Sequence, residues 1–342
     1  MHKQIRIAAL AAGAAAIGAF AGPATAMDYF AGKTITVQVP SGSGGTYHVY
    51  CQLVQRHIGK FLPGNPSTVI QNLPGSGGAK SAAFMANVAP KDGRTIAMIA
   101  PGNNAIPLVR NVKFDVREFK WLGAPAARPS AVWLWHTTKV TKLSQVQAKA
   151  ITIGTSGFGS AGSVFPRLAN KVLSTKFKLI YGYKGGGAIN VSIERGETFG
   201  RWNFYSGFTG VRPTWIPEKK VVPVLAMGPR HPGMKGVPHF TDLLKDGSYE
   251  RKLYDVFGMD LEVGQAFYAP PGTPMKIVST LRTGFNKMLD DKGFQDDIVK
   301  RRVEYSPVRW QKIEKLIEDG YKAATPDVVE GMKSLFVKKK AS

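Results

Sequence analysis

A short apolar strand, a glycine-rich polar loop and a helix follow one another in this chain, and the recurrence of that unit limits the possible folds more than any other property of the sequence. Residues 35–39 form the first predicted strand and 41–46 its loop, and a helix begins near Thr46 with apolar residues at helical spacing. A second strand at 69–72 is followed by the loop 74–78. Alternating strands and helices predict an α/β fold with a mainly parallel sheet, flanking helices and right-handed crossovers.

The pattern starts again near residue 129. Strands are predicted at 131–135 and 151–154, and the second of them leads into the loop 155–162 and a helix. The chain is long enough for two domains of ordinary size. We predict a discontinuous domain one and an inserted domain two. The predicted boundaries are 27–128 plus 262–342 for domain one and 129–261 for domain two.

Glycine- and serine-rich loops that lie between a strand and a helix are candidates for binding an anion. At such a loop, free backbone N–H groups and the positive end of the helix point the same way. A carboxylate binds there without a positively charged side chain. In open α/β sheets these loops meet at the carboxyl ends of the strands. Most single glycine-rich loops only turn the chain, but several in two α/β units favour a shared anion cleft.

The N-terminus has the three-part order of a secretory signal peptide. Lys3 and Arg6 form a basic start, an apolar run occupies 7–20, and 24–26 reads Ala-Thr-Ala, a small-x-small cleavage site. The apolar run is shorter than the roughly 20 residues of a membrane-spanning helix. We therefore predict cleavage after Ala26 and export to the periplasm, with an N-terminal amphipathic or transmembrane helix as the alternative. Later runs are too short or too polar to span a membrane, so the mature chain is not expected to be membrane-embedded.

The formal net charge is +23, which raises the question of a nucleic-acid partner. The basic residues are scattered, however, and the longest basic runs are only 300–302 and 338–340. A surface field that attracts anions therefore fits better than a nucleic-acid interface. The single cysteine, Cys51, cannot form an internal disulfide. It lies on a predicted helix, and we expect its side chain to pack in the hydrophobic core.

The sequence offers little for catalysis or for a cofactor. Residues 157–162 spell G-x-G-x-x-G, but the acid that a dinucleotide site needs after the next strand is missing at 181–184. Neither G-x-S-x-G nor H-E-x-x-H occurs, and His48 and His57 would fall on different faces of one helix. We predict that the protein is not an enzyme and that it carries neither a cofactor nor a metal ion.

Several short motifs, in order along the chain, resemble those of the Bug-type extracytoplasmic solute receptors of tripartite tricarboxylate transporters. They include an opening strand with its glycine-rich loop, an Asn-x-Pro-Gly-x-Gly-Gly stretch, a turn similar to the family's Ala-x-Pro-Asp-Gly, a second glycine-rich loop, a Tyr-Lys-Gly sequence and an Ala-Pro-x-Gly-Thr-Pro sequence. These stand at 33–40, 72–78, 89–93, 155–163, 183–185 and 269–274.

The resemblance implies a periplasmic-binding-protein clamshell of two α/β domains that closes on one organic acid. Most of the predicted ligand-binding residues follow from their positions in or beside these motifs, and His48, Arg201 and Asn203 are added from two segments that depart from the family pattern. In domain one these are Ser41, Gly42, Ser43, Gly44, Gly45, Thr46, Tyr47, His48, Ser76, Gly77, Asn103 and Asn104. In domain two they are Thr155, Ser156, Ser160, Ser163, Lys184, Gly185, Arg201 and Asn203.

Two departures from the family pattern affect the ligand rather than the fold. His48 stands where the family usually has an aspartate, and its protonation near a pKa of about 6.5 would strengthen anion binding at lower pH if it borders the cleft. Arg201 offers a bidentate fork to a carboxylate, and Trp202 or Tyr205 a ring for stacking. The alternative, a surface arginine with core aromatics, remains open.

The resemblance implies a receptor that captures a small organic anion, either a di- or tricarboxylate or an aromatic carboxylate. It would close about its hinge and deliver the ligand to the permease subunits of a tripartite membrane transporter. We expect a periplasmic monomer without a nucleic-acid partner. A periplasmic sensor that docks on a membrane histidine kinase would use the same cleft. A hydrolase on the same fold is a further alternative.

Overall fold

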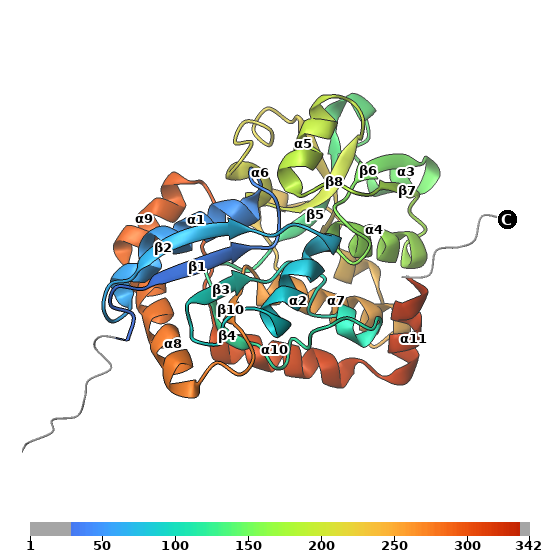
Figure 1. Cartoon of the computed structure of the whole chain (residues 1–342). Helices are drawn as coiled ribbons and strands as arrows, with labels where there is room; N and C mark the ends of the chain where they lie inside the picture. Colours follow the sequence, from blue (N-terminus) through green and yellow to red (C-terminus); the bar gives the residue numbers. More distant parts are fainter. Residues whose placement is uncertain (1–28, 336–342) are drawn as a thin grey trace, which may run out of the picture.

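The computed structural model describes residues 29–335, and its strands form two groups (Figure 1). The part built on a six-stranded sheet is here called lobe one, and the part built on a three-stranded and a two-stranded sheet is called lobe two. Helices flank the sheets in both lobes, which confirms the predicted α/β class. The predicted signal peptide, residues 1–26, lies outside the described residues.

Lobe one is assembled from both ends of the described chain. Its N-terminal elements are β1 (Thr34–Val39), α1 (Thr46–Ile58), β2 (Ser67–Asn72), α2 (Ala79–Asn87), β3 (Thr95–Met98) and β4 (Lys120–Ala124), with short 3-10 turns η2 (Gly59–Phe61), η3 (Ser76–Gly78) and η4 (Ile106–Leu108). Its C-terminal elements are β10 (Phe267–Ala269), α8 (Met275–Asp290), α9 (Lys292–Lys300), β11 (Val308–Arg309) and α10 (Trp310–Ala323). The strand order is β11-β4-β10-β3-β1-β2.

The direction of the strands changes within this sheet. β1 runs parallel to both β2 and β3, as the repeated strand-loop-helix units require. β10 enters after the chain has passed through lobe two and runs antiparallel to β3 and β4. The parallel half therefore carries the glycine-rich loops at one edge, where the carboxyl ends of its strands meet.

Lobe two is built from the middle of the chain. Its elements are β5 (Ser130–Trp135), α3 (Leu143–Ala148), β6 (Ile151–Gly154), α4 (Ala161–Val172), β7 (Phe177–Ile180), α5 (Gly186–Glu194), β8 (Gly200–Phe204), α6 (Ser206–Thr209), β9 (Val221–Met227) and α7 (Tyr249–Val263), with turns η5 (His136–Thr138), η6 (Pro232–Met234) and η7 (Phe240–Leu243). β5 pairs antiparallel with β8 and β9, whereas β6 and β7 are parallel. The last helix, α11 (Pro326–Ser334), packs on α7. The domain boundaries given above stay a prediction.

Helical periodicity in the sequence is reproduced by the buried face of α1. Val49, Leu53, Val54 and Ile58 are buried on this helix and belong to one core cluster with β1 and α8. Cys51 is buried in the same cluster, which confirms its predicted place in the core. Burial raises the pKa of its thiol well above the ordinary value, so the sulfur stays protonated and packs as a small apolar group.

In the sequence, Ser306 before Pro307 predicts a helix that opens at this pair, but the helix begins later. Val308 and Arg309 first form β11, which pairs with β4 at Ala124 and Gly123, and α10 begins at Trp310. The prediction was wrong here because the outer edge of β4 has unpaired backbone groups, and a strand two residues long satisfies them before the helix starts.

Two of the segments that connect the lobes run side by side, and a third, residues 324–325, leads from α10 in lobe one to α11, which packs in the core of lobe two. The first links β4 to β5 through residues 125–129, and the second links α7 to β10 through residues 264–266. The backbone N–H of Arg128 donates to the carbonyl of Leu261 at 2.8 Å, and the N–H of Gln265 donates to the carbonyl of Ala126 at 2.7 Å. Two adjacent crossovers are the arrangement about which two lobes can hinge.

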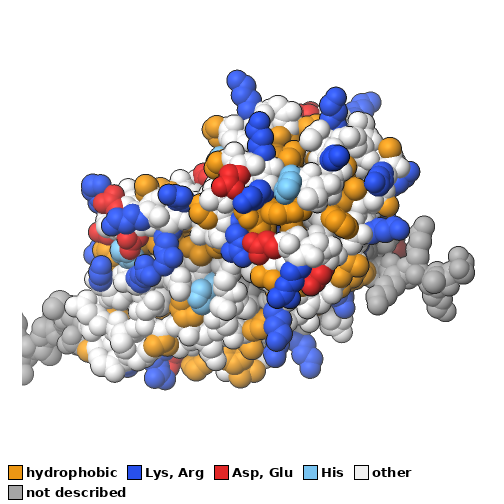
Figure 2. All heavy atoms as spheres, turned by 90° about the horizontal axis from the view of Figure 1, so that it is seen from above, with side chains coloured by type: hydrophobic (Ala, Val, Ile, Leu, Met, Phe, Trp, Pro, Cys, Tyr) orange, Lys and Arg blue, Asp and Glu red, His pale blue; other side chains and the backbone are white. Residues whose placement is uncertain are grey.

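Figure 2 shows one face of the molecule from above, with Lys and Arg side chains spread over both lobes rather than gathered into one stripe. Among residues 29–335, no helix combines the length and apolar character that crossing a bilayer requires.

Candidate functional site

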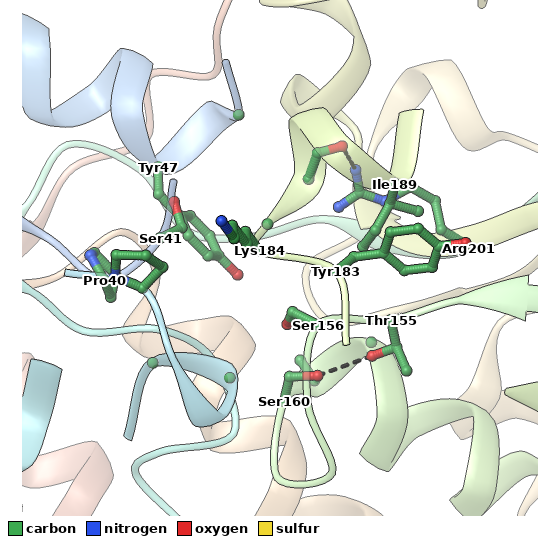
Figure 3. A pocket seen from close by; sticks show the side chains of 18 of the residues that line it. Pro40, Ser41, Tyr47, Thr155, Ser156, Ser160, Tyr183, Lys184, Ile189 and Arg201 are labelled. Atoms are coloured by element: carbon green, nitrogen blue, oxygen red, sulfur yellow. Dashed lines mark hydrogen bonds between the residues drawn. The ribbon is translucent and has the colours of Figure 1, made fainter. Parts of the chain in front are cut away.

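A cavity of about 380 Å³ lies between the two lobes and contains most of the predicted site residues (Figure 3). From lobe one it is lined by Pro40, Ser41, Gly45, Thr46, Tyr47, Pro74, Gly75, Ser76, Gly77 and Gly78. From lobe two it is lined by Gly154, Thr155, Ser156, Ser160, Ala161, Gly162, Gly182, Tyr183, Lys184, Gly185, Gly186, Ile189, Arg201, Trp202, Asn203 and Phe204.

Four helices begin at this cavity, two from each lobe. The N-cap residues of α1, α2, α4 and α5 are Gly45, Gly78, Ser160 and Gly185, and all four line the cavity. None of these helices has a side-chain hydrogen bond at its N-cap. The first N–H groups of α2 and α4 already donate to the carbonyls of Ser76 and Pro101, so a ligand has the other free first-turn N–H groups and the positive ends of all four dipoles available to it. The site attracts negative charge from several directions at once.

Glycine is required where α2 begins. Gly78 has φ +99°, in the left-handed region, and a Cβ atom on it would lie 2.4 Å from the Cβ of Ala100. A side chain at this position would be strained and would also clash with the adjoining loop. The glycine-rich loop of lobe one thus brings the start of α2 close to β3 and the cavity.

Hydroxyl groups form the base of the lobe-two side. The Oγ atoms of Thr155 and Ser160 are 2.9 Å apart, and the hydroxyl of Ser160 donates to the carbonyl of Gly157 at 2.7 Å. Thr155 and Ser160 are both buried, and Figure 3 shows their pair below Ser156 and Tyr183. Hydroxyls both donate and accept, so this edge of the cavity suits a polar ligand group.

Aromatic rings supply the apolar part of the wall. Tyr47 of lobe one stacks on Phe204 of lobe two with ring centroids 5.8 Å apart. Trp202 is buried and stacks on Phe165 at 5.6 Å. Stacking across the lobes ties the first turn of α1 to strand β8.

Arg201 projects from β8 and is buried. Its Nη1 donates to the carbonyl of Gly186 at 2.8 Å and to Oδ1 of Asn190 at 2.9 Å, and its Nε donates to the carbonyl of Trp202 at 3.2 Å. Burial lowers the pKa of its guanidinium to about 10, so the group stays charged at neutral pH. A Cβ atom at position 186 would lie 2.8 Å from Nη1, so glycine there leaves room for the guanidinium.

Some predicted ligand contacts are not among the lining residues. These are Gly42, Ser43, Gly44, His48, Asn103, Asn104 and Ser163. Gly42 instead donates its N–H to the carbonyl of Lys184 at 3.1 Å, which joins the two lobes directly. Ser163 is buried behind the cavity on α4, with its hydroxyl 3.5 Å from that of Tyr181.

His48 is not among the lining residues, and its ring contacts Asn72. Its Nδ1 lies 3.2 Å from Nδ2 of Asn72, which also donates to the carbonyl of Ser41 at 2.8 Å. Partial burial lowers the pKa of His48, and an amide N–H donor requires an unprotonated Nδ1. In this structure His48 therefore supports the first loop as a neutral side chain. The expected strengthening of anion binding at low pH stays a prediction.

Asn103 and Asn104 do not line the cavity but support the loop that does. Nδ2 of Asn103 donates to the carbonyl of Gly77 at 3.0 Å, and Nδ2 of Asn104 donates to Oδ1 of Asp260 at 2.6 Å. Asp260 belongs to α7, on the lobe-two side of the crossovers. The loop 101–104 is thus held from lobe two and in turn holds the loop that lines the cavity.

Asp260 is a buried carboxylate whose ionisation affects stability. Burial raises its pKa to about 6, although the charge of Arg128 and hydrogen bonds from Gly102 and Asn104 act in the opposite direction. A carboxyl group with a raised pKa stabilises the fold fully below its unfolded pKa of about 3.9 and loses that contribution as the pH rises through its folded pKa.

We expect Asp260→Asn to change the pH dependence of stability. Relative to the variant, the wild type should lose on the order of 2 kcal/mol in free energy of unfolding between about pH 4 and about pH 7. Urea unfolding of both proteins at each pH measures this change. Asp115→Asn is the control, and its effect on the pH dependence of stability should have the opposite sign. A hydrogen bond from Arg117 lowers the pKa of Asp115, so this carboxylate stabilises the fold at higher pH. If the difference in free energy of unfolding between the wild type and Asp260→Asn did not change with pH, the expectation would be contradicted.

Sequence reasoning missed several lining residues. Tyr183 and Gly186 flank the predicted Lys184-Gly185 loop, and a wider window around that motif would have included them. Ile189 and Phe204 carry no signal of their own, because buried apolar residues on α5 and β8 look the same whether they face a core or a cavity.

Within the described range, no group of three or more His, Cys, Asp or Glu side chains is arranged to hold a metal ion. The cavity lining itself consists of backbone, hydroxyl, amide, aromatic and cationic groups. Such a set can bind an anion, and it contains no nucleophile paired with a base of the kind that acyl-transfer chemistry uses.

Comparison with known proteins bears on the fold of the chain. No protein-family model matches the chain. A Cupriavidus necator protein described as "UPF0065 protein in gbd 5'region" is 25% identical over 308 residues, which cover 87% of each chain. The solved structure of the periplasmic binding protein BugD has a TM-score of 0.70 at 18% identity, over 90% of this chain and 99% of its own.

A second solved structure is MatC from Rhodopseudomonas palustris with bound malate. It has a TM-score of 0.67 at 18% identity, over 89% of this chain and 99% of its own. These structures confirm the periplasmic-binding-protein fold, and the resemblance to Bug-type receptors read from the motifs is confirmed with them.

Proposed function

Starting from this likeness to the Bug-type solute-binding proteins, we propose that the chain is a periplasmic receptor for a small organic anion. It captures a carboxylate between its lobes, closes about the paired crossovers, and delivers the ligand to the permease subunits of a tripartite tricarboxylate-type transporter. The malate of MatC is a ligand of that chemical class. In this proposal the protein binds and releases its ligand unchanged.

The observation that carries the proposal is the convergence of four uncapped helix N-termini on one cavity. α1 and α2 come from lobe one, and α4 and α5 come from lobe two. A ligand that bridges them gains interactions only when the lobes are together, so its binding favours the closed state. No Asp or Glu is among the described residues that line the cavity, so no carboxylate there repels an anion.

Direct contacts between the lobes are consistent with a closed state. The N–H of Gly42 donates to the carbonyl of Lys184 at 3.1 Å, and the N–H of Ala161 donates to the carbonyl of Pro101 at 3.2 Å. Both bonds join loops at the cavity rim to loops of the other lobe. Opening breaks them and exposes the helix N-termini, and closing restores them around the ligand.

A thermal-shift panel of organic acids tests the proposal. A ligand at about 100 times its Kd should add about 2.7 kcal/mol of stability, which for a chain of this size raises Tm by about 4 °C. The panel includes di- and tricarboxylates, aromatic acids and amino acids, and the uncharged amides of the same acids are the control. Mass spectrometry of the ligand after incubation should show it unchanged. A panel in which no acid raises Tm would contradict the proposal.

A further inference from the structure

Arg201 is a buried cation for which the protein supplies no counter-ion. Only 9% of the residue is exposed, yet no carboxylate within residues 29–335 lies within salt-bridge distance of its guanidinium. Its partners are the carbonyls of Gly186 and Trp202 and the amide oxygen of Asn190. An isolated charge is costly to bury, and the neutral oxygens offset only part of that cost.

The guanidinium is fixed in place, but not all of its N–H donors have an acceptor. Nη1 is held twice and Nε once, whereas Nη2 has no acceptor among the described residues. The neighbouring residue on the same face of β8, Asn203, is 1% exposed and also has an unpaired donor, its Nδ2. Both residues line the cavity from one strand, but Nδ2 of Asn203 is itself buried, so the unpaired donor left for a ligand is Nη2 of Arg201.

Arg201 stands apart from the loops of lobe one. Figure 3 draws it on one side of the cavity, with Pro40, Ser41 and Tyr47 on the other and the Tyr183-Lys184 segment between them. Apolar and aromatic groups, among them Tyr183 and Ile189, lie near it. A ligand that contacts both sides must carry a second acceptor group beyond the one at the lobe-one loops.

We infer that Arg201 selects the ligand by charge: the pocket takes an organic dianion, with one carboxylate at the helix N-termini and a second carboxylate at the Arg201 guanidinium. This inference rests on the proposed receptor function and specifies the ligand of the same site. Asn190 is the positioning residue, since its amide oxygen holds Nη1 and leaves Nη2 for the ligand. A monocarboxylate leaves the buried cation without a partner and binds more weakly.

Matched pairs of acids test the inference. Titration calorimetry compares succinate with butanoate, adipate with hexanoate, and terephthalate with benzoate, so that each pair differs by one carboxylate. For the best pair, we expect the wild type to prefer the dianion by about 100-fold, as is typical of a charge pair removed from water. Arg201→Gln should reduce that preference to less than about tenfold, and should change the affinity for the monoanion by less than about threefold.

Asn190→Asp is a second variant that tests the role of Arg201 even if Arg201→Gln does not fold. The substitution preserves side-chain size and places a carboxylate on an atom now 2.9 Å from Nη1, so the protein supplies the missing counter-ion itself. Preference for the dianion should fall as in Arg201→Gln, while Tm without ligand stays the same or rises. Undiminished preference in Asn190→Asp would overturn the role of Arg201.

The outcomes separate this inference from the proposed function. If no acid binds to the wild type, the receptor proposal fails. If acids bind but monoanions bind as tightly as dianions, or if both variants keep the wild-type preference, the receptor proposal stands and the inference about Arg201 fails.

Discussion

Arg128→Met should lower the free energy of unfolding by about 3–5 kcal/mol, the range found when one member of a buried charged network is removed. Arg128 is fully buried between the crossovers. Its Nη1 donates to the carbonyl of Asp260 at 3.1 Å, and its Nη2 donates to the carbonyl of Ile99 at 2.9 Å and to Oε1 of Gln265 at 3.3 Å. Methionine fills part of the space but leaves these acceptors unsatisfied and removes the positive charge near the Asp260 carboxylate.

Urea unfolding at neutral pH measures the loss. Arg94→Met is the matched control, because Arg94 is about half exposed and pairs with Asp92 at the surface, where ion pairs contribute about 1 kcal/mol or less. The double variant Arg128→Met/Asp260→Asn should be less destabilised than the sum of the two single variants, since the neutral amide no longer needs the cation. A loss below about 1 kcal/mol in Arg128→Met would contradict the assignment of a stabilising role to this arginine.

Gly157→Ala should weaken ligand binding by about ten- to a hundredfold while leaving the fold intact, because overpacking of this kind typically costs about 1–3 kcal/mol. In this structure a Cβ atom on Gly157 would lie 2.7 Å from the backbone nitrogen of Gly77 in the opposite lobe. Backbone cannot move aside as a side chain can. In an open molecule the same methyl group would contact solvent, so the substitution destabilises only the closed state.

Gly42→Ala is the matched control for this prediction. Gly42 also lies at the seam between the lobes, but a Cβ atom there would be 3.5 Å from the carbonyl oxygen of Lys184, an ordinary van der Waals contact. Calorimetry with the best ligand of the thermal-shift panel should give a Kd within about threefold of wild type for Gly42→Ala. Equal affinity in the two variants would mean that the glycine at position 157 does not limit closure.

Local patterns in the sequence anticipated the parts of the fold that local interactions determine. The spacing of Val49, Leu53 and Ile58 predicted the buried face of α1, and the glycine-rich loops predicted where helices begin near the cavity. Much of the candidate lining followed from the same loops, because a loop between a parallel strand and its helix must lie at the carboxyl edge of the sheet.

Other features depend on pairings that no local pattern encodes. Arg128 and Asp260 are far apart in the sequence and meet only because two adjacent crossovers bring them together. Strand β11 exists because β4 offers it an edge, and its two residues have no strand pattern of their own. His48 appeared to belong to the cleft from its place in a motif, but the direction of its side chain depends on Asn72.

The composition of the cavity wall also bears on how capture responds to acidity. Backbone amides and hydroxyls keep their protons throughout the range in which living cells work, and a guanidinium keeps its charge there. No histidine or carboxylate lies among the described wall residues. The wall residues themselves therefore add no pH dependence to uptake, and through them capture should decline only once the acid groups of the cargo take up protons.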